Sequence, residues 1–181
     1  MAEGRLVGPF PEGSDHEEYD RRRRRVLWKM PSGLYVLGSG TGRRRNLMTL
    51  NWATQVATEP KLVAVSVEKG AVTHDLIEAT PSFSLNVLRR ADRAVVRKFV
   101  KPLNDEGDPS SLGGVAVRVA RTGAPIMEMA LAWMDCLVVQ PVDCGSHTLF
   151  VGEIVDCDQG DAGVDGEEVL RMEDTRMSYG G

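Results

Sequence analysis

The chain has 181 residues with a formal net charge of −4 at pH 7, and 42% of the residues are hydrophobic while 27% are charged. This length corresponds most simply to one domain, and the composition is ordinary for a globular protein. The negative charge argues against general nucleic-acid binding, which needs a basic face, and no apolar run approaches the roughly 20 residues of a membrane span.

The N-terminus and the cysteines indicate where the protein works. The first residues lack a continuous apolar stretch, so no secretory signal is visible. The three cysteines, Cys136, Cys144 and Cys157, are an odd number without a CxxC spacing. This pattern fits reduced thiols better than a disulfide framework or a zinc site, and it predicts a cytoplasmic protein without a metal centre.

The first 29 residues differ in character from the rest of the chain. Residues 1–15 are polar and rich in Gly and Pro, which predicts a loosely held arm. Residues 17–29 carry acids first and basic residues later, the polarity that a helix dipole favours. The arginines at 21–25 are interpreted as a solvated helix face rather than a nucleic-acid contact. We therefore expect residues 1–29 to form an arm and a short helix, and residues 30–181 to form the main domain.

From Gly33 onward the pattern changes to short β-rich runs broken by turns. The Gly-rich segment 38–42 is expected to be a flexible hairpin tip, and it lacks the Gly-Lys-Ser/Thr of a nucleotide P-loop. Two short helices are predicted, one over 74–79 capped by Thr73 and one running from Asp92 to Phe99. Residues 104–114 read as a polar loop. The predicted strands are 34–37, 47–52, 62–67, 83–88, 115–119, 130–139 and 149–155.

Seven strands with few helices favour a mainly β fold, a closed or split β-barrel, over a sandwich, because closure removes vulnerable sheet edges. Helices this few and short cannot cover both faces of a parallel sheet. A Rossmann fold is also disfavoured because no strand is followed by a Gly-x-Gly-x-x-Gly turn.

Two polar clusters interrupt the apolar runs. In the strand 47–52, Leu47, Thr49 and Asn51 alternate with Met48, Leu50 and Trp52, so Thr49 and Asn51 are expected to face the same side. Met48 and Trp52 add apolar surface. Taken alone, this strand could equally turn its polar face to water.

The second cluster follows the strand 62–67. Its valines are expected to face one side and Ser66 the other, after which the chain turns at Gly70 into the helix beginning at Thr73. Ser66, Lys69 and Thr73 would surround the helix N-terminus, where free N–H groups bind anions. The alternative is an ordinary capped helix with a solvated lysine. A ligand that matches both clusters is planar, partly apolar and anionic at one end, which is the profile of FMN.

Several ordered motifs resemble the flavin reductase-like family, from about Met30 to the C-terminus. They are Asn46-Leu47-Met48-Thr49-x-x-Trp52, Pro60-x-Leu62-Val63-Ala64-Val65-Ser66-Val67, Thr73-His74-x-Leu76-Ile77, Phe83-x-Leu85-Asn86-Val87-Leu88, Gly145-x-His147-Thr148-Leu149-Phe150-Val151-Gly152-Glu153-Ile154, and Leu170-Arg171 with Tyr179-Gly180-Gly181. The resemblance implies an FMN-binding split β-barrel with Greek-key-like connections, and a homodimer with flavin at the subunit interface. Members reduce free flavin with NAD(P)H, often for a partner monooxygenase, or hold FMN as a redox cofactor.

The resemblance also implies roles for individual residues. Residues Asn46, Leu47, Met48, Thr49, Leu50, Asn51 and Trp52 would line the isoalloxazine ring, largely through backbone groups. Ser66, Lys69 and Thr73 would bind the phosphate. Asn86 would lie near the ribityl chain or serve as a structural amide, and Tyr179 would reach a flavin across the dimer or anchor the tail.

His147 stands where the family places a histidine near the flavin and the nicotinamide. Many relatives carry an acidic residue directly before it, whereas this chain has Ser146, so a carboxylate-oriented imidazole is not expected. Cys136 lies in an apolar strand and is expected in the core. Hydride transfer to flavin needs ring stacking and charge stabilisation, not a nucleophile, which agrees with the lack of a catalytic triad.

The sequence therefore predicts an NAD(P)H-dependent flavin oxidoreductase that uses FMN, with FAD as the other candidate flavin and NAD(P)H as co-substrate. The alternatives are a flavoredoxin-like electron carrier with tightly bound FMN, and a non-catalytic flavin- or haem-binding barrel. The sequence does not distinguish NADH from NADPH, and it does not identify a partner oxygenase.

Overall fold

The computed structural model describes residues 6–103, 108–159, 168–175 and 177. The chain divides into two compact units, one made of Met1–Pro31 and Arg176–Gly181 and the other of Ser32–Thr175. Among the described residues no helix is both long enough and apolar enough to cross a membrane.

The first unit contains the helix α1 (His16–Leu27), which confirms the helix predicted over 17–29 with slightly earlier bounds. Asp15 caps it by accepting a hydrogen bond from the Glu18 N–H at 2.9 Å. Glu17 and Glu18 lie in its first turn and Arg24 and Arg25 in its last, as the helix dipole favours. Arg23 donates to the carbonyl of Val7 at 2.6 Å and pairs with Asp20, so this arginine ties the preceding segment to the helix.

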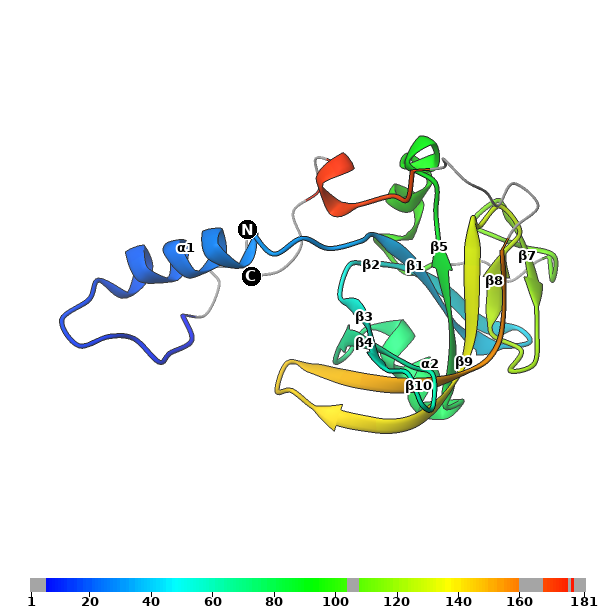
Figure 1. Ribbon diagram of the computed structural model, residues 1–181, viewed down its shortest axis with the longest axis horizontal. Coiled ribbons are helices and arrows are strands. Elements are labelled where there is room, and N and C mark those ends of the chain that lie inside the picture. Colours follow the sequence, from blue (N-terminus) through cyan, green and yellow to red (C-terminus); the bar gives the residue numbers. More distant parts are fainter. Residues whose placement is uncertain (1–5, 104–107, 160–167, 176, 178–181) are drawn as a thin grey trace. The chain divides into compact units, whose positions relative to one another are not determined.

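The second unit is built mainly from antiparallel strands, so the predicted mainly β class is confirmed. Its larger sheet has the order β2-β1-β5-β9-β10-β4-β3, and a smaller sheet has the order β6-β7-β8. In Figure 1 the long strands β9 and β10 form a strongly curved hairpin at the lower side of this unit. The strands are β1 (Tyr35–Thr41), β2 (Arg44–Leu50), β3 (Ala53–Ala57), β4 (Leu62–Glu68), β5 (Ser82–Val87), β6 (Ser111–Leu112), β7 (Val115–Val119), β8 (Pro125–Met127), β9 (Ala132–Asp143) and β10 (His147–Gln159).

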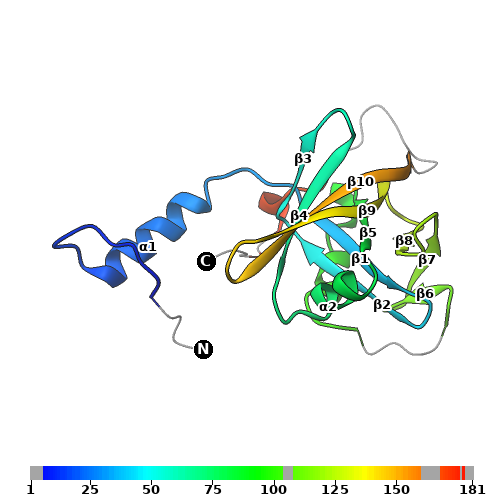
Figure 2. The ribbon, with the colours of Figure 1, turned by 90° about the horizontal axis from the view of Figure 1, so that it is seen from below.

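Few helical segments accompany these strands. The helix α2 (Val72–Ala79) packs against β1 and β2 (Figure 2). Three short 3₁₀ segments follow it, namely η1 (Arg90–Asp92), η2 (Val95–Phe99) and η3 (Met172–Asp174).

The core is apolar and is drawn from several strands and α2. Val63, Val65 and Val67 all belong to it, as their predicted shared face requires. Cys136 is fully buried among them, which confirms its expected core position. The segment before η3 closes the unit, because Leu170 is fully buried and exchanges backbone hydrogen bonds with Leu34 and Leu88 at 3.1 and 2.9 Å.

Three strands, β3, β6 and β8, were not predicted from the sequence, for two physical reasons. β3 has the sequence ATQVA and lies at a sheet edge with its central residues exposed, so it lacks an apolar signal. β6 and β8 have only two and three residues, which is too short for a period to register.

The Gly-rich segment 38–42 is not a flexible hairpin tip, and this prediction is wrong. Gly38, Ser39 and Gly40 lie inside β1, fully or nearly fully buried, and the turn is confined to Gly42 and Arg43. A Cβ on Gly38 would clash with the Pro125 carbonyl oxygen and the Ser84 hydroxyl. The glycine therefore serves close packing between β1 and β8 rather than flexibility.

The predicted helix caps also differ from the structure. Ala71, not Thr73, occupies the N-cap of α2, and no side chain caps this helix. Asp92 does not start the second helix either, since it ends η1 and the following segment, η2, begins at Val95. Both predictions relied on residue type alone, whereas the hydroxyl of Thr73 is used in a tertiary contact.

Candidate functional site

Asn46 and Thr73, 27 residues apart, form a buried pair that joins β2 to the first turn of α2. The Asn46 side-chain amide donates to the Thr73 hydroxyl oxygen at 2.9 Å. The Asn46 amide oxygen accepts a 3.3 Å hydrogen bond from the backbone N–H of Leu103. Since both side chains are almost fully buried, their direct role is to fix the N-terminus of α2 against β2.

The remaining side chains of β2 mostly point into the protein. Leu47 and Leu50 are buried, and Met48 is half-buried against the core. The hydroxyl of Thr49 is buried and donates to the Val96 carbonyl at 2.6 Å, so it does not share an exposed polar face with the half-buried Asn51. These side chains are committed to packing.

On one side β2 has no strand partner among the described residues, although Asn46, Leu47, Thr49 and Leu50 are themselves buried. β2 is an edge strand of the larger sheet and pairs only with β1 in the described part of the chain. An edge strand presents alternate N–H and C=O groups without a strand partner. Within residues 46–52, Met48, Asn51 and Trp52 have accessible surface, so a flat polar ring can meet the strand at these positions.

Trp52, Ser66 and His147 come together where β2 ends. The Ser66 N–H donates to the Trp52 carbonyl at 3.0 Å. The indole of Trp52 is 42% exposed, and its ring centre lies 5.0 Å from that of His147 at an interplanar angle of 57°. His147 begins β10, opposite Glu68 of β4, and its Nδ1 lies 2.9 Å from the Ser146 hydroxyl. The rings of Trp52 and His147 thus form an accessible aromatic surface, and the Ser146 hydroxyl orients the imidazole.

Lys69 lies one residue beyond the end of β4 and contacts the tip of the β9–β10 hairpin twice. Its backbone N–H donates to the Ser146 carbonyl at 2.9 Å, and its ammonium pairs with Asp143 at 2.7 Å. Asp143 also accepts from the Gly145 N–H at 2.7 Å. The hydrogen bonds from Lys69 and then from Gly145 hold the pKa of the Asp143 carboxyl below its ordinary value.

The N-terminus of α2 follows Lys69 by three residues. Because its N-cap is Ala71 and no side chain caps it, the first-turn N–H groups lack a side-chain acceptor. Such groups carry the positive end of the helix dipole and favour an anion. Lys69 and the uncapped helix start are donors of the kind that bind a phosphate group.

Asn86, another predicted contact, is used inside the barrel unit. Asn86 is fully buried. Its side-chain NH₂ donates to the Val36 carbonyl at 2.9 Å and to the Ser84 hydroxyl oxygen at 3.2 Å, and its amide oxygen accepts from the Met127 N–H at 2.8 Å. The structure therefore gives Asn86 a structural role. Tyr179 lies outside the described residues.

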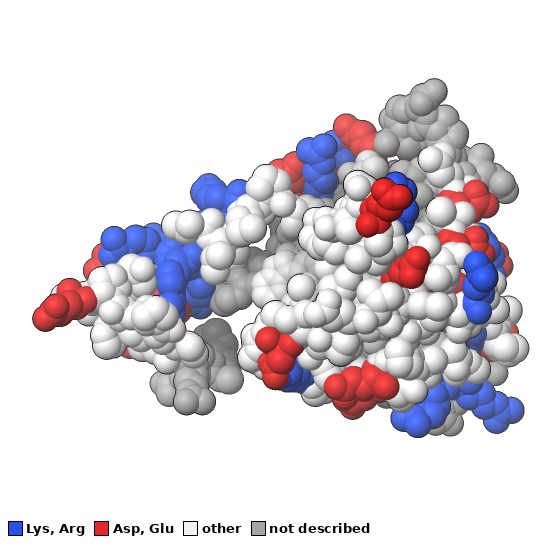
Figure 3. All heavy atoms as spheres, turned by 60° about the horizontal axis from the view of Figure 1, so that its bottom comes forward, with Lys and Arg blue, Asp and Glu red and all other residues white. Residues whose placement is uncertain are grey.

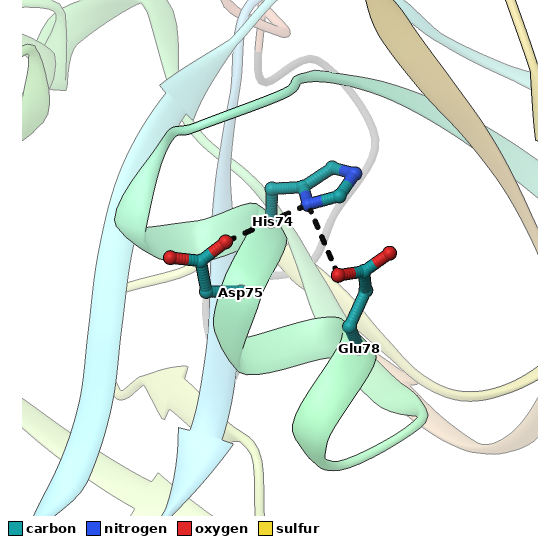
Figure 4. A group of neighbouring side chains, drawn as sticks. All are labelled: His74, Asp75 and Glu78. Carbon is teal, nitrogen blue, oxygen red and sulfur yellow. Dashed lines mark ion pairs between the residues drawn. The ribbon is translucent and has the colours of Figure 1, made fainter.

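Sequence reasoning missed the surroundings of His74, the residue after Thr73. Its Nε2 lies 2.8 Å from the Thr148 hydroxyl, and its side chain is buried. Figure 4 shows its Nδ1 turned toward the carboxylates of Asp75 and Glu78, at 3.8 and 3.7 Å. These distances exceed hydrogen-bonding range, and both acids are exposed, so Thr148 provides the direct contact that positions the ring.

Asp143 is the other residue that the sequence did not reveal. It lies 74 residues from Lys69, at the end of a strand whose outer half is exposed. Only the pairing of β10 with both β4 and β9 brings the two charges together. A local sequence motif could not have predicted this contact, because the two residues are far apart in the chain.

Comparison with known proteins gives a family match over most of the chain. The model of the flavin reductase like domain matches residues 27–178. A putative diflavin flavoprotein A 3 from a Nostoc species is 30% identical over 136 residues, which cover 72% of this chain but 23% of that protein. The chain thus spans about a quarter of the length of this relative.

Two solved structures are similar over much of their length. The NADH:FAD oxidoreductase SgcE6 of Streptomyces globisporus C-1027 has a TM-score of 0.73 and 27% identity, with 95% of this chain and 98% of that chain covered. BorF, the flavin reductase component of a bacterial two-component tryptophan halogenase, has a TM-score of 0.67 and 30% identity, with 78% and 88% covered. These similarities confirm the predicted β-barrel fold.

Proposed function

Because this chain belongs to the flavin reductase-like family, we propose that it binds FMN and transfers hydride from NADH or NADPH to flavin. The observation that carries this proposal is the set of groups along β4 and β10. Lys69 and the uncapped start of α2 follow the end of β4, and His147, whose ring lies near that of Trp52, is paired with Glu68 at that same end. This arrangement suits a ligand that is flat at one end and anionic at the other.

In this proposal the phosphate is bound by Lys69, by Ser66 and by the backbone N–H groups around Thr73. The Thr73 hydroxyl is buried against Asn46, so its contribution comes through the main chain. The free edge of β2, over residues 46–52, borders the isoalloxazine through backbone groups, with Trp52 adding an apolar surface. Tyr179 remains a proposed contact from the tail.

The bound flavin supplies a ring that accepts a hydride at one nitrogen while negative charge grows elsewhere on it. The protein groups position this ring and donate hydrogen bonds to its edge. Trp52 and His147 offer the surface against which a nicotinamide ring can lie, and His147 acts there as a positioning residue rather than a proton donor. The fixed backbone donors of β2 need no reorganisation as charge develops.

The test is a steady-state assay with purified protein, each nicotinamide in turn, and FMN, FAD or riboflavin. We expect flavin-dependent oxidation of at least one nicotinamide above the rate without protein. A protein that is yellow as isolated but inert toward both nicotinamides would instead be the flavoredoxin-like electron carrier. A protein that binds flavin without any turnover would be the non-catalytic barrel.

FAD is the competing flavin, because the similar Streptomyces enzyme is an NADH:FAD oxidoreductase. Competition between FMN and FAD for the protein, measured by fluorescence, separates the two. Tighter binding of FMN supports the proposal, whereas a clear preference for FAD would replace FMN as the flavin used.

We also propose that residues 30–181 act as a homodimer, with 1–29 as a separate arm. Apolar side chains on the outer half of β9 and on β3 are exposed, including Leu137, Val139 and Val56. Figure 3 shows a broad uncharged area on one face of the barrel unit, bordered by separate acidic and basic groups. A two-fold dimer would cover such a surface and give the flavin a second wall. By analogy with BorF, the reductase component of a two-component halogenase, the reduced flavin would serve a separate partner enzyme, which we propose to be a flavin-dependent monooxygenase.

A further inference from the structure

The ammonium of Lys69 already has an anionic partner within the same chain. Its Nζ lies 2.7 Å from Asp143 Oδ1, and the same oxygen accepts the Gly145 N–H at 2.7 Å. A carboxylate thus occupies the position on Lys69 that the proposed function gives to the flavin phosphate. Both side chains remain accessible, with 39% of Lys69 and 74% of Asp143 exposed.

We infer that Asp143 determines flavin specificity by competing with the flavin phosphate for Lys69. This inference rests on the proposed phosphate role of Lys69. A flavin that carries a phosphate displaces the carboxylate and gains the lysine, whereas riboflavin has no group that can do so. Asp143 thereby sets how much tighter the protein binds FMN than riboflavin.

The contact strengths favour an exchange. An exposed ion pair contributes little, because solvent screens it and two long side chains lose freedom. A phosphate carries up to two charges, and in the proposed site it accepts from the Lys69 ammonium and from the uncapped start of α2. Asp143 keeps its Gly145 hydrogen bond after it leaves Lys69, so the displaced carboxylate does not lose all of its partners.

The hairpin tip does not depend on this ion pair for its position. The backbone N–H of Lys69 holds the Ser146 carbonyl at 2.9 Å, and the Cys144 N–H donates to the His147 carbonyl at 2.9 Å. β10 is paired with β4 from His147 onward. Since main-chain bonds fix the tip, the side-chain pair is free to serve binding.

The experiment measures the affinities of FMN and riboflavin for four proteins: the wild type, Asp143→Asn, Lys69→Ala and the double variant. Asp158→Asn is the matched control for net charge, because Asp158 is an exposed acid on β10 that likewise accepts a backbone N–H and has no lysine partner in the described contacts. Thermal unfolding of each variant reports whether the barrel is intact.

We expect Asp143→Asn to tighten FMN about threefold to tenfold and to leave riboflavin unchanged. In the Lys69→Ala background the same substitution should have no effect, and Asp158→Asn should change neither affinity beyond twofold. If Lys69→Ala weakens FMN selectively while Asp143→Asn leaves FMN unchanged or weakens it, the competition model is overturned and the phosphate site stands. If Lys69→Ala affects both flavins equally, the phosphate site itself is overturned, and the inference with it.

Discussion

The structure gives His147 and Asn86, two residues singled out by motif, very different surroundings. The sequence predicted His147 near the flavin and the nicotinamide, and Asn86 either near the ribityl chain or as a structural amide. The structure places His147 against the exposed Trp52, where a ligand can reach it. It places Asn86 inside the barrel with each of its amide groups used. The sequence could not separate the two, because only tertiary hydrogen bonds decide which amide or imidazole is free.

His147→Ala should slow flavin reduction by tens-fold or less. The imidazole is expected to position a ring and not to move a proton in the hydride step, so the larger general-acid effect of about 10²–10⁴ does not apply. FMN affinity should change little, since the phosphate end supplies most of the binding. Stopped-flow reduction at saturating nicotinamide measures this directly. An unchanged rate with a lower melting temperature would make His147 a purely structural residue.

Asn86→Ala should destabilise the barrel by about 2–4 kcal/mol, because the Met127 N–H and the Val36 carbonyl lose their buried partner. Chemical denaturation measures the free energy of unfolding. The folded fraction should still bind flavin with the wild-type affinity. A stable variant that binds flavin poorly would indicate that Asn86 contacts the flavin instead.

The three cysteines should differ in reactivity. Burial raises the pKa of the Cys136 thiol to about 12, whereas Cys144 and Cys157 are exposed. Since the thiolate is the reactive form, a thiol reagent at pH 8 should label two cysteines in the native protein and three after denaturation. Rapid labelling of Cys136 in the native state would show that the core around β9 opens easily.

At the scale of elements, strong local patterns predicted the structure and weak ones did not. The apolar run of β4 and the alternating β7 were found from the sequence, and β7 has the predicted bounds. The edge strand β3 was missed because its short, exposed sequence ATQVA lacks an apolar alternation. The Gly-rich part of β1 was misread because glycine signals both flexibility and close packing, and only the neighbouring β8 shows which applies.

The site shows the same division between local and tertiary information. The motif around Lys69 predicted a helix just after the lysine, and α2 begins three residues beyond it. The hydroxyl of Thr73 was expected at the cap and instead meets Asn46. The partner of Lys69, Asp143, is distant in sequence and depends on two strand registers.

Gly38→Ala should destabilise the protein by about 3 kcal/mol or more, since its Cβ would meet backbone that cannot yield without moving β8. Gly42→Ala is the matched control in the same hairpin. Gly42 has φ +59 and open space around it, so its cost should be only the backbone strain of about 1–2 kcal/mol. Thermal unfolding of both variants compares them. Equal losses would mean that packing at Gly38 is not tight.

For the whole molecule, the composition and the strand-rich pattern predicted a globular, mainly β protein, and the fold agrees with this prediction. The seven-stranded sheet and the small sheet leave few helices, as the strand-rich sequence predicted. What composition could not indicate is which exposed surface meets another molecule. Exposed apolar residues occur in both units, and their roles follow only from the strands that carry them.

Light scattering should give about twice 19.8 kDa if the outer half of β9 forms the proposed dimer interface. Val139→Glu should shift the protein to monomer and weaken FMN. Val119→Glu on β7 is the control, because the two valines are 51% and 54% exposed and only the first lies on β9. A monomeric wild type that binds FMN tightly would contradict the shared site.

The central claim is that this protein transfers hydride from nicotinamide to flavin. Mixing the protein and FMN with NADH or NADPH under anaerobic conditions, and following the visible absorption of oxidised flavin, tests it most directly. The account predicts that flavin absorption disappears far faster with the protein than without it, for at least one nicotinamide. It also predicts that the Lys69→Ala variant needs a higher FMN concentration than the wild type to reach the same rate. Persistence of the oxidised flavin spectrum with both nicotinamides, in a protein that demonstrably binds FMN, would contradict the account.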